Sequence, residues 1–314
     1  MIASALTVTL NPAIDETILL DRLRPGHVHR AQAVRFNPGG KGVNVASCLA
    51  DWGGGEVIAT GLLGHNNTSH FEALFTTKRI IDAFIRIPGD TRTNIKLSHD
   101  GETTDINLPG LVPSAAELQA LLARSAGLAT TGTLALLAGS LPSGVADETY
   151  ATLTDTLIRR GARVMLDTSG TALKAALAGK AQPFCVKPNR AELEYFAGHS
   201  LTGDDAVIEA ARGLTARGVQ LVVVSLGAEG ALFITESQIL RAALPALRVT
   251  STVGAGDAMV AGIMAALREE AGLERLARLA TAFAAGKLGL DGPNLPPRGQ
   301  IEALGGAVTI QIIQ

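Results

Sequence analysis

The sequence predicts an α/β protein that combines a mostly parallel central sheet with a second, smaller sheet. From Ser114 onward, short apolar runs such as 133–138 and 221–225 alternate with helical stretches. Continuous apolar strands separated by helices are typical of a parallel sheet that helices cover on both faces. Residues 16–36 and 80–109 instead show the two-residue alternation of strands and no helical period, so we expect them to pair as the smaller sheet.

Length and charge restrict the class of protein. The 314 residues are long for one core, so we expect either one large α/β domain over residues 1–314 or a domain with an appended lobe. The 27 basic and 29 acidic side chains leave a net charge of −2, which gives no strong field to attract nucleic acid or an anionic membrane surface. Anionic ligands must then be held by a few local groups.

The first residues and the two cysteines predict a soluble, cytoplasmic protein. Residues 1–10 lack the basic start and small-residue cleavage site of a signal peptide. No apolar run reaches the ~18 residues of a membrane span without polar interruption. Cys48 and Cys185 have no partner at metal-ligand spacing, so we expect two buried, reduced thiols.

The first expected strand, 6–10, ends at Asn11 and is followed closely by Asp15. Ligands of open α/β sheets gather at the carboxyl ends of the strands, so both side chains are candidates for binding hydroxyl groups. A simple Asn-Pro turn with a capping Asp is the alternative.

A glycine cluster, Gly39-Gly40-Lys41-Gly42, precedes a helix that we expect to run through Trp52. Its spacing is not that of the G-x-x-x-x-G-K-[ST] phosphate loop. Glycines before a helix start let the backbone approach a ligand closely, with Lys41 and Asn44 as hydrogen-bond donors. The alternative is that Lys41 is a solvated surface lysine.

The smaller sheet is expected to act as a lid. Its strands near 83–87, 92–97 and 103–108 include a hairpin at Asp100-Gly101. A sheet beside the strand ends can exclude water from a site at those ends, and Arg92 on it can clamp a phosphate. A strand at 56–63 and a helix at 71–77 precede these strands.

After Ser114, further expected strands also end at candidate ligand-binding residues. Strand 133–138 leads to Gly139-Ser140, and strand 183–187 leads to Asn189. The expected helices are 114–126, 147–160, 171–178 and 272–288, and the expected strands are 133–138, 162–167, 183–187, 221–225, 231–235 and a short one after 307.

Two of these loops have both a functional and a structural interpretation. Asn189 and Glu192 offer oxygen ligands that suit Mg²⁺, but their spacing also fits a helix N-cap with its capping-box Glu. The glycines of 227–230 can lie along the phosphates of a nucleotide or form an ordinary hairpin loop.

The stretch 250–262 indicates chemistry most clearly. Gly254 and Gly256 lead directly into Asp257 and an apolar helical run. Free amides and the dipole at such a helix start favour an anion. The carboxylate can take a proton from a hydroxyl while those amides hold a transferring phosphoryl group. Because Met259 replaces the third glycine of G-x-G-x-x-G, the stretch is not a dinucleotide fingerprint. A glycine turn capped by Asp is the alternative.

Taken in order, these segments resemble the PfkB family of ribokinase-like carbohydrate kinases over nearly the whole chain. Residues 39–44 look like the family's first signature, and 251–257 look like its second. The resemblance implies a ribokinase-like three-layer αβα sandwich with a mostly parallel central sheet and a small β-sheet lid, through which a homodimer forms. It also implies Asp257 as the catalytic base beside an anion hole made by Gly254, Ala255 and Gly256.

The resemblance further implies ATP and Mg²⁺ as cofactors. Residues 189–192 match the family's metal motif, so Asn189 and Glu192 would hold Mg²⁺. The nucleotide would lie along Lys187, Asn189, Ser225, Gly227 and Gly230.

The phrases 91–97, 139–144 and 225–231 are similar to those of family members that phosphorylate ketohexose phosphates. The reaction we expect transfers a phosphoryl group from ATP to the C6 hydroxyl of fructose 1-phosphate. The alternatives are fructose 6-phosphate or tagatose 6-phosphate as acceptor, or a non-catalytic sensor of sugar phosphate. The resemblance assigns sugar binding to Asn11, Asp15, Gly39, Gly40, Lys41, Asn44, Arg92 and Ser140.

Overall fold

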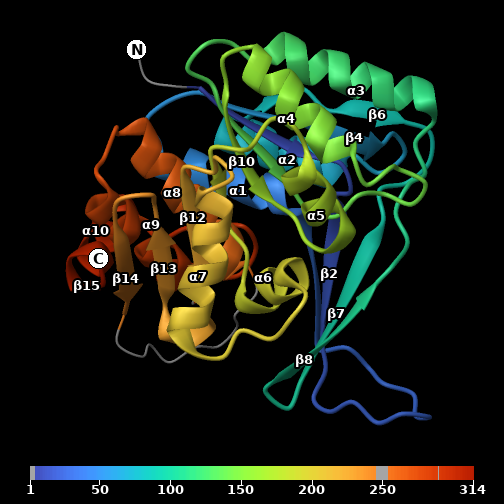
Figure 1. Ribbon diagram of the computed structural model, residues 1–314. Helices are drawn as coiled ribbons and strands as arrows, with labels where there is room; N and C mark the ends of the chain where they lie inside the picture. The colour runs from blue at the N-terminus through green and yellow to red at the C-terminus, as the bar shows by residue number, and fades with distance from the viewer. Residues whose placement is uncertain (1–3, 245–253, 289) are drawn as a thin grey trace.

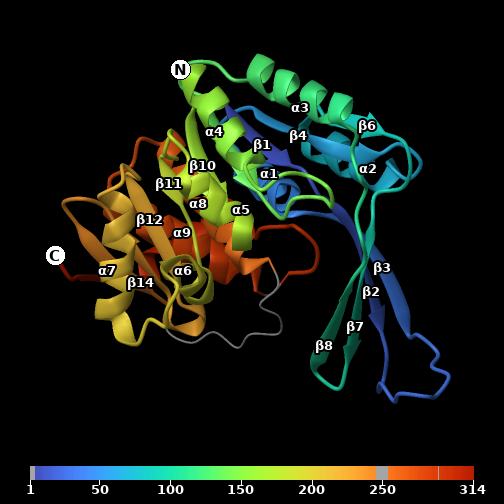
Figure 2. The same cartoon turned by 45° about the vertical axis from the view of Figure 1, so that its right-hand side comes forward.

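The computed structural model describes residues 4–244, 254–288 and 290–314. Residues 250–253 of the second glycine stretch lie outside the described residues. A large sheet lies between two layers of helices, and a small sheet projects from this body as an arm (Figures 1 and 2).

The large sheet is mostly parallel, as the sequence predicts. Its strands lie in the order β15-β14-β13-β12-β11-β10-β9-β1-β4-β5, and β6 also pairs with β4. Pairs from β4 across to β12 are parallel, whereas β12 to β15 form an antiparallel extension. The strands are β1 (Ala5–Thr9), β4 (Val57–Gly64), β5 (Ile81–Asp82), β6 (Ile85–Ile87), β9 (Leu134–Ala138), β10 (Arg163–Asp167), β11 (Cys185–Val186), β12 (Leu221–Ser225), β13 (Ala231–Ile234), β14 (Ile239–Ala243) and β15 (Thr309–Ile312).

Alternating side chains divide the interior into two cores, one on each face of this sheet. Leu134 and Leu136 belong to the core covered by α1, α2 and α8 to α10, whereas Ala135 and Leu137 belong to the core covered by α3 to α7. The three-layer αβα arrangement is therefore confirmed. The helices are α1 (Lys41–Trp52), α2 (Ser69–Lys78), α3 (Ala115–Leu128), α4 (Thr149–Arg159), α5 (Gly170–Ala178), α6 (Arg190–Ala197), α7 (Gly203–Thr215), α8 (Ala255–Arg268), α9 (Leu273–Lys287), α10 (Arg298–Ala307) and the 3₁₀ turn η1 (Gly227–Glu229).

The small sheet has the strand order β3-β2-β7-β8. The strands are β2 (Ala13–Leu19), β3 (Ala33–Gly39), β7 (Thr93–His99) and β8 (Glu102–Asn107). The expectation that all of 80–109 joins this sheet is wrong for its first part, because β5 and β6 pair with β4 in the large sheet. The alternation of side chains identifies a strand, but it does not reveal with which sheet edge that strand will pair.

The register gives the small sheet one apolar and one polar face. Ile18 pairs with Val34 and Leu97, and Ile95 pairs with Ile106, so apolar side chains share one face. Polar side chains on the opposite face, including Asp15, Thr17, Asn37 and Lys96, line a cavity.

The sequence analysis did not predict α7, β14 or α10. The α7 signal was present, because Val207, Ala211 and Leu214 are buried at helical spacing. The two cysteines are buried and free, as expected. Within the described part of the chain, no helix combines the length and apolarity that a membrane crossing needs.

Candidate functional site

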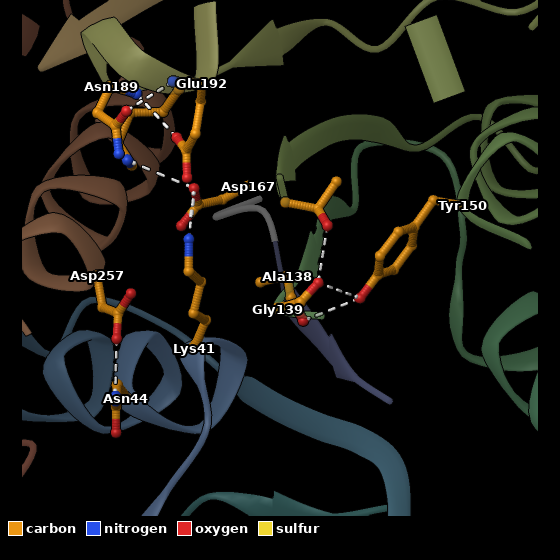
Figure 3. A network of polar contacts seen from close by, with 11 residues as sticks. Lys41, Asn44, Ala138, Gly139, Tyr150, Asp167, Asn189, Glu192 and Asp257 are labelled. Atoms are coloured by element: carbon orange, nitrogen blue, oxygen red, sulfur yellow. Dashed lines mark hydrogen bonds and ion pairs between the residues drawn. The ribbon is translucent and has the colours of Figure 1, made fainter. Parts of the chain in front are cut away.

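The two glycine stretches meet at one site although they lie more than 200 residues apart. Asn44, in the first turn of α1, donates a hydrogen bond from Nδ2 to Oδ2 of Asp257, 2.7 Å away in the first turn of α8. Figure 3 shows these two side chains pointing toward each other. The start of α1 and the start of α8, which follow the two glycine stretches, therefore lie side by side at one site.

The backbone at the start of α8 depends on a glycine. Gly254 is the N-cap, and its φ of 79° lies in the left-handed region that favours glycine. A Cβ atom there would also lie 3.2 Å from Cε of Lys287. The amides of the first helical turn have no acceptor within the helix. This geometry suits the predicted anion hole of Gly254, Ala255 and Gly256.

A buried carboxylate joins two lysines beside this helix start. Oδ1 of Asp167, at the end of β10, lies 3.1 Å from Nζ of Lys41 (Figure 3). The same oxygen lies 3.4 Å from Nζ of Lys187. The Asp167 side chain is only 2% exposed. Lys41 is therefore not the solvated surface lysine of the alternative interpretation. The sequence analysis missed Asp167, although its position at the end of an apolar strand was a usable signal.

The electrostatics keep these groups in defined charge states. Burial opposes the charge of Lys41, but the carboxylates of Asp167 and Asp257 raise its pKa to about 12. Burial likewise opposes ionisation of Asp167, yet Lys187 and Lys41 hold its pKa below the ordinary value. For Asp257, burial and the negative charge of Asp167 raise the pKa to about 6. A carboxyl group with that pKa is a base near neutral pH and a better proton acceptor than an ordinary Asp.

A second group of predicted residues lies where β1 and β9 end. Nδ2 of Asn11 donates to Oγ of Ser140, 3.1 Å away. Arg92 has no carboxylate in salt-bridge contact among the described residues. Its guanidinium instead makes long hydrogen bonds of 3.3–3.4 Å to the backbone carbonyls of Asn11, Pro12 and Leu108. Among the described residues, its positive charge is thus not neutralised by a salt bridge.

A buried tyrosine fixes the loop that carries Ser140. The hydroxyl of Tyr150 donates to the carbonyls of Ala138 and Gly139, at 3.1 and 3.0 Å (Figure 3). Thr168 donates to the same Gly139 carbonyl at 2.9 Å. The end of β9 is therefore held in place next to the end of β10.

Asp15 faces the first glycine stretch from the small sheet. Its carboxylate accepts a 3.3 Å hydrogen bond from Asn94 and lies 3.6 Å from Nζ of Lys96. A Cβ atom on Gly39 would come within 2.9 Å of Oδ2 of Asp15, so a side chain there would displace the carboxylate. Gly40 follows as the N-cap of α1.

A cavity of about 250 Å³ lies between the small sheet and the helix starts. Its lining includes Asp15, Asn44, Lys96, Gly254 and Lys287. The cavity thus connects the predicted sugar-binding residues with the predicted anion hole.

The predicted nucleotide side is adjacent along the sheet edge. Asn189 forms a β-bridge with Ser225, which leads into η1 and Gly230. Asn189 and Glu192 form a complete capping box: Oδ1 of Asn189 accepts from the Glu192 amide, and Oε2 of Glu192 accepts from the Asn189 amide, both at 2.8 Å. The structure therefore contains the helix N-cap that was the structural interpretation of this spacing.

The capping box leaves Oε1 of Glu192 without a hydrogen bond from the described residues. The described chain contains no cluster of three His, Cys, Asp or Glu side chains that could hold a metal. Mg²⁺ is commonly held by one or two carboxylates together with waters and substrate phosphates. Glu192 therefore fits a role as a single protein ligand, whereas the Asn189 oxygen is already committed to the helix cap.

Fold and site together define the class of protein, a kinase that transfers phosphoryl groups to a small molecule. Within that class, the chain belongs to the pfkB family of carbohydrate kinases, whose model matches residues 8–297. It is 52% identical to a 1-phosphofructokinase of Xanthomonas campestris pv. campestris, with 98% of each chain covered. It is 46% identical to a 1-phosphofructokinase of Rhodobacter capsulatus, covering 98% of this chain and 97% of that one.

Solved structures give the same assignment. The phosphofructokinase-2 of Escherichia coli in complex with potassium superposes with a TM-score of 0.91 at 31% identity, covering 98% of this chain and 99% of that one. A possible 1-phosphofructokinase from Thermotoga maritima superposes with a TM-score of 0.90 at 25% identity, covering 99% and 100%. The ribokinase-like fold predicted from the sequence is confirmed.

Proposed function

We propose that this protein uses ATP to phosphorylate the C6 hydroxyl of fructose 1-phosphate, giving fructose 1,6-bisphosphate. The observation that carries the proposal is the 2.7 Å hydrogen bond between Asn44 and Asp257, because it puts the sugar-binding turn next to the base and the anion site. Similarity over the full length to relatives named 1-phosphofructokinase supports this acceptor.

The proton and the phosphoryl group each have an assigned place. Asp257 accepts the proton of the C6 hydroxyl as that oxygen attacks the γ-phosphorus, and the bond from phosphorus to the ADP oxygen breaks. The amides of Gly254, Ala255 and Gly256 hold the phosphoryl oxygens during transfer. Asn44 fixes the orientation of the Asp257 carboxylate while Asp15 binds sugar hydroxyls.

The remaining polar residues bind the two substrates. Arg92, Lys41 and Ser140, with Asn11 beside them, meet the phosphate that the sugar already carries. ATP lies along Lys187, Asn189, Ser225, Gly227 and Gly230. Glu192 contributes to holding Mg²⁺, which neutralises charge on the nucleotide phosphates when bound.

The apolar face of the small sheet supports a homodimer. Val34, Phe36 and Ile106 on that face are 45%, 48% and 44% exposed, and a contiguous apolar patch on a protein surface marks an interaction site. A second copy of the chain can cover it without blocking the cavity, because the cavity lies on the opposite, polar face.

A comparison of four acceptors tests the proposed function. Fructose 1-phosphate, fructose 6-phosphate, tagatose 6-phosphate and fructose are each supplied with Mg-ATP while ADP release is followed. We expect the highest kcat/KM with fructose 1-phosphate, and fructose 1,6-bisphosphate as the product. A higher kcat/KM with one of the 6-phosphates would make that sugar the acceptor. Absence of ADP release with all four would favour a non-catalytic sensor.

Replacing Arg92 by Ala is expected to raise KM for fructose 1-phosphate and leave KM for ATP unchanged. The increase should be roughly 10- to 100-fold, which corresponds to the ~1.5–3 kcal/mol of a hydrogen bond to a charged group. Arg86→Ala is the matched control, because Arg86 lies on β6 and pairs with Glu72 and Asp82. An unchanged KM in Arg92→Ala would mean that the sugar phosphate is held elsewhere.

A further inference from the structure

Lys287 is a buried lysine that the mechanism above does not use. It is the last residue of α9 and is only 7% exposed. Within the described part of the chain, no carboxylate forms a salt bridge with it. Lys187, which is 6% exposed, differs because it is paired with Asp167.

The Lys287 side chain runs along the start of α8. Its Cε would lie 3.2 Å from a Cβ atom on Gly254, and Nζ of Lys187 would lie 3.7 Å from a Cβ atom on Gly256. Two lysines therefore flank the predicted anion hole. Lys287 also lines the cavity together with Asp15 and Asn44, which places it on the side where the sugar is proposed to bind.

The described residues satisfy this ammonium only in part. Nζ of Lys287 donates to the backbone carbonyl of Leu290 at 2.6 Å, but an ammonium group has three donors. Burial lowers the pKa of Lys287, because an unpaired charge is costly away from water. A bound anion would offset that cost. Lys187 is less available to such an anion than Lys287, because Lys187 is already paired with Asp167.

We propose that Lys287 is a further catalytic residue, whose ammonium binds the phosphoryl group in transit at the start of α8. This assignment rests on the proposed kinase function. The ammonium stabilises negative charge on the phosphoryl oxygens while the bond to ADP breaks and the bond to the sugar oxygen forms. It transfers no proton, since the hydroxyl proton goes to Asp257.

Lys287→Met tests the assignment, because Met keeps an unbranched chain and removes the charge. We expect kcat to fall about 10²- to 10³-fold, as when one donor to a transition-state anion is removed, with little change in KM for either substrate. Methylammonium chloride should restore part of the kcat lost in Lys287→Ala, whose short side chain leaves room for the amine, and sodium chloride at the same ionic strength should not. Lys174→Met, at an exposed position of α5, is the control and should keep normal kcat.

Two results would overturn the assignment. One is a normal kcat in Lys287→Met. The other is a loss of kcat in Lys287→Ala that methylammonium does not reverse and that accompanies a lower unfolding midpoint, which would make Lys287 a structural residue.

A measurement without sugar separates this inference from the choice of acceptor. Mg-ADP with aluminium fluoride imitates a phosphoryl group in transit, so Lys287→Met should bind this pair more weakly while its affinity for Mg-ADP alone stays normal. Suppose that fructose 1-phosphate is not the best acceptor, but that Lys287→Met binds the fluoride complex more weakly than the wild type does. The sugar assignment is then wrong and the role of Lys287 stands. Equal binding of the fluoride complex by both proteins would remove that role.

Discussion

Asp257→Asn is expected to lower kcat by about 10²- to 10⁴-fold, the usual contribution of a positioned general base. Asn has nearly the same shape and can still bond to Asn44, so KM for both substrates should change little. Steady-state kinetics with fructose 1-phosphate measure both constants. Asp155→Asn, a partly exposed carboxylate on α4, is the control. Near-normal turnover in Asp257→Asn would remove the assignment of the base.

The pH dependence gives an independent check on the same residue. Because burial raises the pKa of Asp257 to about 6, kcat/KM of the wild type should fall as the pH drops through about 6 and the base becomes protonated. The residual activity of Asp257→Asn should not show this step. A step that persists unchanged in the variant would assign it to another group.

The stability of Asp257→Asn should change in the opposite direction to its activity. A carboxyl group whose pKa is raised from 3.8 to about 6 on folding reduces the free energy of unfolding as the pH rises through that interval. Asn carries no such charge, so the variant should be at least as stable as the wild type at pH 7. Thermal unfolding of both proteins at pH 7 measures the difference.

Asp167→Asn is expected to lower the free energy of unfolding at pH 7 by about 3 kcal/mol. That value is the lower end for breaking a buried ion pair, chosen because Lys41 is partly exposed and solvent screens its share. The variant should also lose turnover, since Lys41 and Lys187 would no longer be held together. Urea unfolding measures the first effect and steady-state kinetics the second.

Asp204→Asn is a matched control for Asp167→Asn. Asp204 also pairs with two cations, Arg190 and Arg241, but its side chain is 30% exposed, so its loss should cost no more than about 1 kcal/mol.

The stabilisation by Asp167 should depend on pH. The pKa of Asp167 is lowered on folding, so its contribution to stability is present above the unfolded pKa of 3.8 and is lost as the pH falls through the folded pKa. Equal free energies of unfolding of the wild type and Asp167→Asn at pH 7 would contradict the role of this carboxylate.

Much of the fold follows from local patterns in the sequence. The apolar runs at 133–138 and 221–225 and the helices between them have periods that a short window reveals, and both sheets were predicted from such windows. The pattern at 83–87 predicted a strand but not its partner, because strand residues look alike whichever edge they bind. Packing placed that strand against β4.

Some residues of the candidate site could likewise be identified from local sequence, and others could not. The glycines before Lys41 and Asp257 were identifiable because close backbone approach to a ligand and a helix start need particular residues at fixed spacing. The spacing of Asn189 and Glu192 fitted both a metal site and a helix cap, and the folded structure shows the capping box.

By itself, the sequence determined the helices and strands other than α7, β14 and α10, the glycine turns, and the carboxylate at the start of α8, since each depends on neighbouring residues. The tertiary structure alone decided that Asp167 lies between Lys41 and Lys187 and that Lys287 lies against Gly254. Lys41 and Asp167 are separated by 126 residues. Charges so far apart in the chain interact only after the parallel strands have brought their carboxyl ends to one edge of the sheet.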